Sequence, residues 1–291
     1  MAKDILSLGE FTIIRRIGNG ARSTIYLATD EEDGSLVALK RVIVEKPEDY
    51  RVLEQTELEY KVAREIDHPY VRKCYRIRRI RSMFKVRELL LSMEHFEGKT
   101  LEDSTTLSLG DVLLVFRMVA TGLSAMHQRG YVHCDIKPNN ILISKSGTIK
   151  IIDLGQSCRI GTIKSRIQGT PDYIAPEQVK RRTLTPKTDI FNLGATMYWA
   201  LTGKNVPTLI PKTKNGIGRR EPPKCPAPHE IKRQLPLGIS MLVMDCVKND
   251  PAERPPSMAD VIAGLDAMIH SIFGGKIRAN RNASNDHRVA Q

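Results

Sequence analysis

The sequence predicts an α+β fold in which a small antiparallel β-sheet lobe with one helix precedes a larger, mainly helical lobe. Short apolar runs separated by glycine or charged residues fill roughly the first ninety residues, as is typical of strands. Beyond them, apolar residues recur at helical spacing. The 291 residues are enough for two lobes that share an interface.

The N-terminal third is predicted to hold five strands and one helix. The helix is expected over the charged stretch Glu48–Ile66, with Pro47 placed to begin it. The strands are rich in Ile, Val, Leu and Tyr, and we expect them at Phe11–Ile17, Thr24–Ala28, Leu36–Val44, Val71–Ile80 and Lys85–Met93.

The rest of the chain is predicted to be mainly helical. Apolar residues from Val112 to Met126, and again from Met258 to Ile272, follow one another at steps of three or four along a single helix face. Two short strands, Ile141–Ile143 and Thr148–Ile152, interrupt the helices. The segment 205–236 is rich in Pro, Lys and Arg and is expected to be mostly loop.

Composition limits the class of protein. Apolar residues make up 41 % and charged residues 27 %, as in ordinary globular chains, and the net charge of +12 favours acidic partners. The five cysteines form no C-x-x-C pair, so we expect a reduced, cytoplasmic protein without structural zinc. We expect no membrane span, since no apolar run approaches about 18 residues.

A glycine-containing loop, "IGNGARSTIY", spans Ile17–Tyr26. Because a strand is predicted on both sides, it differs from the strand–loop–helix fingerprint of dinucleotide sites. Glycines at this position would let backbone N–H groups approach phosphates closely. An ordinary Gly-Asn-Gly hairpin turn is the alternative.

Lys40 ends the apolar alternation of "VALK" and is therefore expected inside a cleft. A buried ammonium group needs an anion. Glu59, nineteen residues on in the predicted helix, is one candidate, and Glu57 competes with it. A surface lysine on an edge strand is the alternative interpretation.

The stretch "VHCDIKPNNILI" crowds an acid, a base and two amides against a short strand. Asp135 is suited to accept a hydroxyl proton, and Lys137 to neutralise charge on a transferred phosphate. Asn140 offers an amide oxygen, and Asp153 after the next strand offers a carboxylate, both hard ligands for Mg²⁺. Taken singly, each aspartate is more typical of a loop residue that caps a turn.

Seven short motifs follow one another along the chain, namely "GNGARS", "VALK", "HCDIKPNN", "DLG", "GTPDYIAPE", "DIFNLG" and "DPAERPPS". In this order they resemble the eukaryotic-like (Hanks-type) serine/threonine protein kinases, most of all the bacterial members. The resemblance covers about residues 11–273, and the order and spacing of the motifs make it specific. It implies a bilobal fold with a segment 1–10, an N-lobe over 11–93, a hinge and C-lobe over 94–274 and a disordered basic tail over 275–291.

The resemblance implies an ATP-dependent phosphotransferase with Mg²⁺ or Mn²⁺ as its metal. Asp135 would be the catalytic base, with Lys137 on the γ-phosphate and Thr170 setting the position of the substrate hydroxyl. Asn140 and Asp153 would bind the metal. The implied ATP-binding residues are Ile17, Gly18, Asn19, Gly20, Ile25, Ala38, Lys40, Glu59, the gatekeeper Met93, and Glu94 and Phe96 of the hinge.

Three further residues would support this machinery. Asp189 would hold the catalytic-loop backbone from a central helix. Glu177 and Arg254 would form a buried ion pair beneath the substrate platform. The sequence departs from the family at Ser23, in place of the third glycine, and at Leu154, in place of Phe.

Cys134 is the departure with a functional consequence. Many family members carry at this position an arginine that a phosphate on the activation segment neutralises. Cys134 has no such charge, so we expect no strict need for activation-segment phosphorylation. Thr162 and Ser165 lie close to several basic residues and remain candidates for modification.

We expect phosphoryl transfer to Ser or Thr of protein substrates, with acidic residues flanking the acceptor because segment 205–236 carries a net charge of +5. A pseudokinase scaffold is the alternative, and "GTPDYIAPE" argues against a small-molecule phosphotransferase. The basic stretch 72–87 is either a solvated strand face or a docking surface for an acidic partner. Its few aromatic residues argue against nucleic-acid binding, and the oligomeric state is left open.

Overall fold

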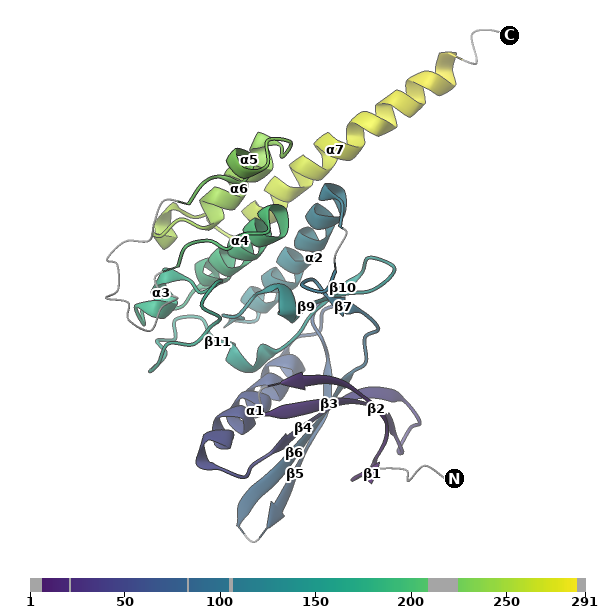
Figure 1. Ribbon diagram of the computed structural model, residues 1–291, viewed down its shortest axis with the longest axis vertical. Helices are drawn as coiled ribbons and strands as arrows, with labels where there is room; N and C mark the ends of the chain where they lie inside the picture. Colours follow the sequence, from purple (N-terminus) through teal and green to yellow (C-terminus); the bar gives the residue numbers. More distant parts are fainter. Residues whose placement is uncertain (1–6, 21, 83, 105–106, 209–224, 287–291) are drawn as a thin grey trace. The chain divides into compact units, whose positions relative to one another are not determined.

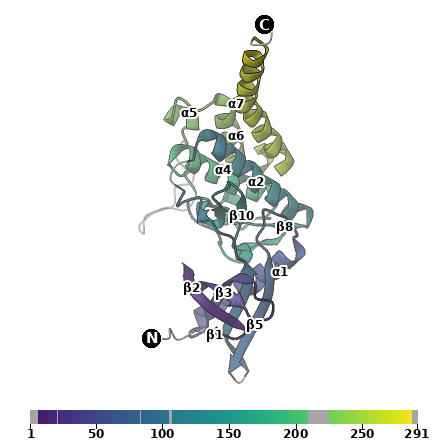
Figure 2. The ribbon, with the colours of Figure 1, turned by 90° about the vertical axis from the view of Figure 1, so that its right-hand side faces the viewer.

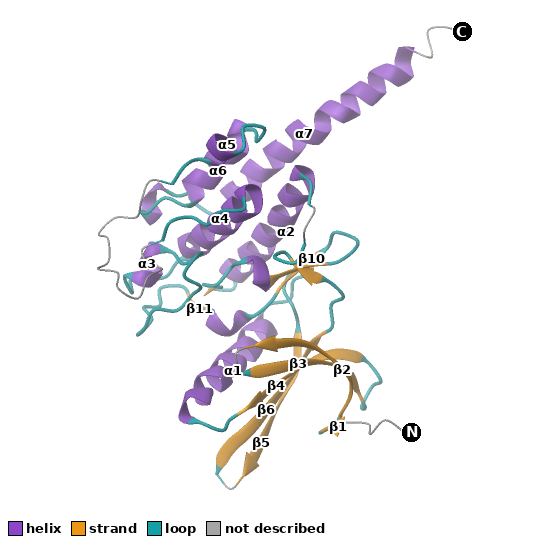
Figure 3. Cartoon of the chain, in the orientation of Figure 1, coloured by secondary structure: helices purple, strands orange, loops and turns teal. Residues whose placement is uncertain are grey.

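A computed structural model of the protein describes residues 7–20, 22–82, 84–104, 107–208 and 225–286, with side chains as far as Gly274. The chain divides into two compact units, which are described separately (Figures 1 and 3). Unit 1 comprises Met1–Gly98 and Lys150–Ser157. Unit 2 comprises Lys99–Ile149 and Cys158–Gln291.

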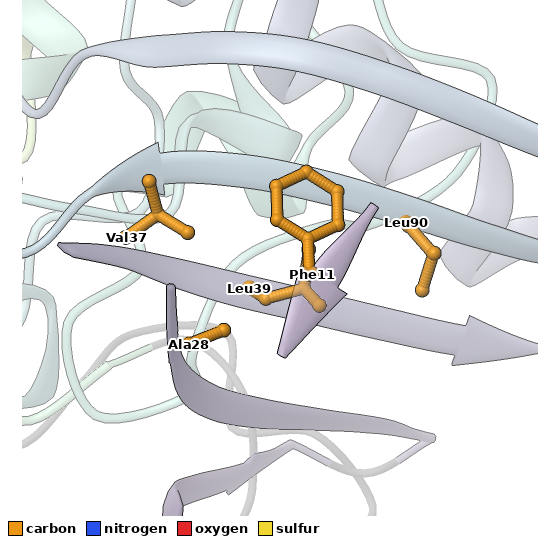
Figure 4. Close-up of a cluster of buried hydrophobic side chains, with 5 residues drawn as sticks. All are labelled: Phe11, Ala28, Val37, Leu39 and Leu90. Atoms are coloured by element: carbon orange, nitrogen blue, oxygen red, sulfur yellow. The ribbon is translucent and has the colours of Figure 1, made fainter. Parts of the chain in front are cut away.

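Unit 1 is built on a six-stranded antiparallel sheet in the order β1-β2-β3-β4-β6-β5. Five apolar residues of the sheet form a core cluster, drawn in Figure 4. The cluster contains Phe11, Ala28, Val37, Leu39 and Leu90. The strands are β1 (Ser7–Leu8), β2 (Phe11–Gly20), β3 (Ser23–Asp30), β4 (Leu36–Ile43), β5 (Cys74–Ser82) and β6 (Lys85–Glu94).

The helix of unit 1, α1, spans Tyr50–Glu65. A 3₁₀ turn over Pro47–Asp49 precedes it, and the Asp49 carboxylate accepts hydrogen bonds from the N–H groups of Glu45 and Lys46 at 3.0 and 2.8 Å. The start of α1 is thus fixed by local hydrogen bonds, and its buried residues include Leu53, Glu59 and Val62.

The segment Lys150–Ser157 belongs to unit 1 because its backbone pairs with that unit. Ile151 donates to the carbonyl of Tyr70 at 2.7 Å and accepts from the N–H of Arg72 at 3.0 Å. A Cβ on Gly155 would lie 2.9 Å from the backbone carbonyl oxygen of Gln55 in α1. Only glycine therefore allows this turn to pack so closely on the helix.

Unit 2 is mainly helical. α2 packs against α7 and α4, and α4 also packs against α6 (Figure 2). α4 is buried along almost its whole length. The helices are α2 (Leu109–Gln128), α3 (Pro176–Val179), α4 (Pro186–Thr202), α5 (Pro228–Ile231), α6 (Leu237–Cys246) and α7 (Met258–Asp286).

Short strands complete unit 2. β7 (Lys99–Thr100) pairs with β9 (Ile141–Ile143), and β8 (Tyr131–Val132) pairs with β11 (Cys158–Arg159). The chain passes from unit 2 into unit 1 within β10 (Ile149–Ile151). These pairings hold the two ends of the polar stretch that runs from His133 to Asn140.

One helix of the described residues, α2, is long and apolar enough to cross a membrane by length and composition. Of its most apolar window, 56 % is buried inside the structure.

The helix α2 begins at a capping box in which Ser108 accepts from the Asp111 N–H at 3.2 Å and its own N–H donates to the Asp111 carboxylate at 3.0 Å.

The observed elements confirm the predicted α+β class. The structure continues α7 through Asp286, whereas the sequence analysis expected a disordered tail from residue 275. The absence of proline over 276–286 is compatible with this helix. Within the predicted loop 205–236, Pro228–Ile231 forms α5, and residues 209–224 lie outside the described part of the chain.

The basic stretch 72–87 contains eight Lys or Arg residues and no acid. Ion pairs inside unit 1 engage five of the eight, which favours a solvated, locally neutralised strand face over a docking surface. The pairs are Arg72–Glu59, Lys73–Asp67, Arg76–Asp30, Arg78–Glu10 and Arg79–Glu57.

Candidate active site

The glycine loop of unit 1 joins two antiparallel strands, as the sequence predicts. Gly18 pairs in register with Ile25, and Gly20 with Ser23. The register shifts between Arg16 and Gly18, so the ladder is irregular where the loop begins. Among the implied nucleotide contacts, Ile17 and Asn19 belong to β2 in this loop, and Ile17 is exposed.

Lys40 forms an ion pair with Glu59 of α1, with 2.7 Å between Nζ and Oε2. Both side chains are largely buried, and the competing Glu57 instead binds Arg79 at 2.5 Å. Burial acts to lower the pKa of Lys40, but the negative charges of Glu59 and Asp153 raise it overall. Lys40 is therefore a fixed cation.

Near Lys40, the strands β4 and β6 carry buried apolar residues, and a charged residue follows them along β6. Ala38 in β4 faces Met93 in β6 in register, and both are buried. Glu94, the next residue, accepts a hydrogen bond from the Lys73 N–H at 3.2 Å and pairs with Lys150 at 2.7 Å. Phe96 follows β6 and lies outside the regular elements.

Asp153 follows β10 in a left-handed backbone conformation, with φ of 63°. This region is uncommon for residues other than glycine and often marks functional positions. The 3₁₀ turn that begins after it, Leu154–Gln156, packs on α1. Asp153 and the Lys40–Glu59 pair thus belong to the same unit.

Asp135 is the centre of a hydrogen-bond network in unit 2. Its Oδ1 accepts from the N–H and the hydroxyl of Thr170 at 3.0 and 2.9 Å. Its Oδ2 lies 3.0 Å from Nζ of Lys137, which also donates to the Thr170 hydroxyl at 2.8 Å. A buried carboxylate, an ammonium group and a hydroxyl therefore converge at one point.

Asn140 is held in place by the same network. Its Nδ2 donates to the Asp135 backbone carbonyl at 2.8 Å and to the Asp135 carboxylate at 3.3 Å. Since the nitrogen is engaged, the amide oxygen is the atom that suits a hard cation.

Among the described residues, no group of three or more His, Cys, Asp or Glu side chains could hold a metal ion. Asn140 in unit 2 and Asp153 in unit 1 each offer one hard oxygen of the kind that Mg²⁺ binds.

Asp189, at the start of α4, holds the backbone of the polar stretch. Its carboxylate accepts from the N–H groups of His133 and Cys134, both at 2.8 Å, and lies 2.9 Å from Nε2 of His127. Burial acts to raise the pKa of Asp189, but the hydrogen bond and charge of His127 lower it overall, with help from His133 and the Cys134 N–H. A buried anion thus fixes Cys134 at its left-handed φ of 67°.

Gln178 of α3 is a supporting residue that the sequence analysis missed. Its Nε2 donates to the carbonyls of Cys134 and Gln168 at 2.8 and 3.0 Å, and its Oε1 accepts from Asn192 at 3.0 Å. The only signal in the sequence is its position directly after "APE". It ties the backbone beside Asp135 to the segment before Thr170.

The predicted ion pair between Glu177 and Arg254 is present and buried. The guanidinium group donates twice to the carboxylate, at 2.7 and 2.9 Å. It also donates to the carbonyls of Lys187 and Lys248 at 2.7 and 2.8 Å. The pair therefore joins α3 and the start of α4 to the turn before α7.

The protein kinase domain family matches residues 11–263 of this chain. The chain belongs to the protein kinase family. This kinase is 28 % identical to the serine/threonine-protein kinase PknD of Chlamydia pneumoniae over 88 % of its own length and 31 % of that protein. It is 32 % identical to STE20 of Candida glabrata over 82 % of its own length and 26 % of that protein, and 26 % identical to PrkC of Bacillus subtilis, over 88 % and 40 %.

These similarities confirm the predicted membership of the Hanks-type kinases and the likeness to bacterial members. The serine/threonine kinase names of the relatives support the expected type of activity for this kinase, and the family implies ATP with a divalent metal. The kinase spans about a quarter to two fifths of the length of these relatives.

Proposed function

We propose that this protein is a serine/threonine protein kinase that transfers the γ-phosphate of ATP to Ser or Thr hydroxyls of protein substrates. The observation that carries the proposal is the convergence of Asp135, Lys137 and Thr170 on one point in unit 2. Asp135 is the base that orients the substrate hydroxyl and accepts its proton. Lys137 neutralises charge on the transferred phosphoryl group, and Thr170 fixes the distance between them.

For the nucleotide, we propose that Lys40 binds the α- and β-phosphates, held in place by Glu59. The backbone from Gly18 to Gly20 covers the phosphates. Ile17, Asn19, Ile25, Ala38 and Met93 line the nucleotide site, and Glu94 to Phe96 contact the adenine.

For the metal, we propose that Asn140 and Asp153 each bring one oxygen to Mg²⁺ or Mn²⁺. The ion supplies charge neutralisation for the phosphate oxygens. The orientation of the Asn140 amide supports this assignment. Its nitrogen donates a hydrogen bond to the Asp135 backbone carbonyl, so the oxygen is the amide atom suited to the metal.

A pseudokinase scaffold is a weaker alternative, because Lys40, Asp135, Asn140 and Asp153 are all present in the sequence. Lys137, two residues after Asp135, together with "GTPDYIAPE", favours Ser and Thr over Tyr as acceptors.

The functional limits we propose are 11–93 for the N-lobe and 94–274 for the hinge and C-lobe. We also propose substrates with acidic residues near the acceptor and no nucleic-acid partner. A reducing, cytoplasmic setting suits the five free cysteines, and α2 is proposed as a core helix rather than a membrane span.

The proposal is tested by following transfer of labelled γ-phosphate from ATP to a panel of acidic and basic generic proteins, with and without Mg²⁺. We expect phosphoserine and phosphothreonine but no phosphotyrosine. Lys40→Met removes a buried cation and should lower transfer at least about a hundredfold. Lys73→Met removes an exposed cation paired with Asp67 and serves as the matched control, with native activity.

Nucleotide binding by the native chain without transfer under any metal would favour the pseudokinase. Equal transfer by the native chain and Lys40→Met would contradict the proposed phosphate contact.

We further propose that the kinase does not require phosphorylation of its activation segment. Cys134 is buried in an apolar cluster with Val132 and Leu184, so no cation at this position needs a phosphate. The double variant Thr162→Ala, Ser165→Ala should keep kcat/KM within about threefold of the native value, less than about 1 kcal/mol in activation free energy. Native chain treated with a phosphatase is the control, and complete loss of activity in the double variant would overturn this proposal.

A further inference from the structure

Two cysteines that the proposed reaction does not use lie side by side in unit 2. The sulfur atoms of Cys134 and Cys158 are 3.6 Å apart, although the residues are 24 positions apart in the sequence. Both are free thiols. Cys134 directly precedes Asp135, and Cys158 opens the strand β11. A covalent bond between them would therefore connect the polar stretch from His133 to Asn140 with β11.

From this juxtaposition we propose that Cys134 and Cys158 form a reversible disulfide when the kinase meets hydrogen peroxide. The sulfur atoms need to approach by about 1.5 Å to reach the usual S–S bond length of about 2.05 Å.

The surrounding backbone holds the two thiols in this arrangement. β8 and β11 pair in register, with Val132 opposite Cys158 and Tyr131 opposite Arg159. The Arg159 guanidinium lies 4.0 Å from the centre of the Tyr131 ring, and Ile160 donates to the Gly130 carbonyl at 2.9 Å. Asp189 and Gln178 fix the N–H and the carbonyl of Cys134. These contacts hold the backbone around both cysteines in place.

The two thiols differ in their exposure and in their pKa, as a reaction with peroxide requires. Cys134 is fully buried, whereas Cys158 is partly exposed. A hydrogen bond with Cys134 lowers the pKa of Cys158 and raises the pKa of Cys134, and the positive charge of Lys164 further favours the Cys158 thiolate. Cys158 is therefore the nucleophile and Cys134 the thiol that resolves the intermediate.

The oxidation proceeds in two balanced steps. The Cys158 thiolate attacks one peroxide oxygen, so an S–O bond forms, the O–O bond breaks, and the departing hydroxide takes a proton to become water. The Cys134 thiol then gives up its proton and its sulfur attacks the Cys158 sulfenic acid. The S–S bond forms, the S–O bond breaks, and a second water leaves. Two thiols lose two electrons, and one peroxide is reduced to two waters.

The disulfide would fix the present pairing of β8 and β11. Because the cross-link removes freedom from the unfolded chain over 24 residues, we expect the melting temperature to rise by about 5–10 °C. A thiol reductant should return it to the starting value.

The test treats the full chain with one equivalent of hydrogen peroxide, blocks remaining thiols and maps linked peptides without reduction. We expect a Cys134–Cys158 linked peptide and the higher melting temperature in the native chain. Cys225→Ser, which removes a partly buried thiol elsewhere, is the matched control and should behave as native. Cys158→Ser should show neither the linked peptide nor the shift.

A second measurement separates the roles of the two thiols. In Cys134→Ser the sulfenic acid has no resolving thiol, so a dimedone-type probe should label Cys158 more strongly than in the native chain. Should this variant fail to fold, the order of reaction is read from brief peroxide treatment of the native chain, in which dimedone should label Cys158 before Cys134. No linked peptide in the folded native chain, or first labelling at Cys134, would overturn the proposal. None of these readouts depends on kinase activity.

Discussion

Asp135→Asn should lower kcat for phosphoryl transfer by about 10²–10⁴-fold while leaving the affinity for ATP nearly unchanged. This is the range by which a positioned general base accelerates a reaction. In the native chain the Oδ1 of the Asp135 carboxylate accepts from Thr170, and its Oδ2 accepts from Lys137 and Asn140. An amide in its place must point its NH₂ group at one set of these donors. The variant therefore loses the base and also the contact that positions it.

The measurement is steady-state transfer of labelled phosphate together with direct titration of nucleotide binding. Asp245→Asn, on the exposed side of α6, removes a carboxylate of the same unit and should keep native kcat. Loss of ATP affinity equal to the loss of kcat would mean that the substitution disturbs binding instead. If Asp135→Asn kept the native kcat, Asp135 would not be the catalytic base.

Local signals predicted several elements well. The strand Ile141–Ile143 has the predicted bounds, because three apolar residues lie between the polar Asn140 and Ser144. α1 begins at Tyr50 rather than at Glu48, since the carboxylate of Asp49 organises a separate turn before it. Boundaries of this kind depend on interactions between residues that are close in the sequence, so a short stretch of sequence is enough to predict them.

Other boundaries depend on partners that are distant in sequence. The predicted strand Val71–Ile80 is observed as Cys74–Ser82, because Val71 instead forms a parallel bridge with Ile151. α4 carries no clear apolar stripe because it is buried on nearly all sides. A central helix around Asp189 was predicted only through the family resemblance.

The candidate site shows the same division. The pairs Lys40–Glu59 and Glu177–Arg254 were expected through the family motifs, and both are present. The bonds of Gln178 could not be predicted, since an amide side chain has many possible partners and sequence spacing does not select among them. The contact between Cys134 and Cys158 was likewise out of reach, because it depends on the pairing of β8 with β11.

Arg254→Met should destabilise the kinase by about 3–5 kcal/mol, the cost of leaving a buried charge without its partner. The Glu177 side chain is only 5 % exposed, so its carboxylate cannot turn to water for compensation. About two to four degrees of melting temperature per kcal/mol are typical for a unit of this size, so the expected loss is roughly 6–20 °C. Thermal and urea unfolding of both chains measures it.

A surface pair in the same unit supplies the matched control. Arg117 and Asp266 form an ion pair whose side chains are 41 % and 45 % exposed, so Arg117→Met should cost less than about 1 kcal/mol. Adding Glu177→Leu to Arg254→Met should recover only part of the loss, because the carbonyls of Lys187 and Lys248 still lack their donor. Equal costs for the buried and the exposed substitution would show that burial of Glu177 does not determine the stability of this region.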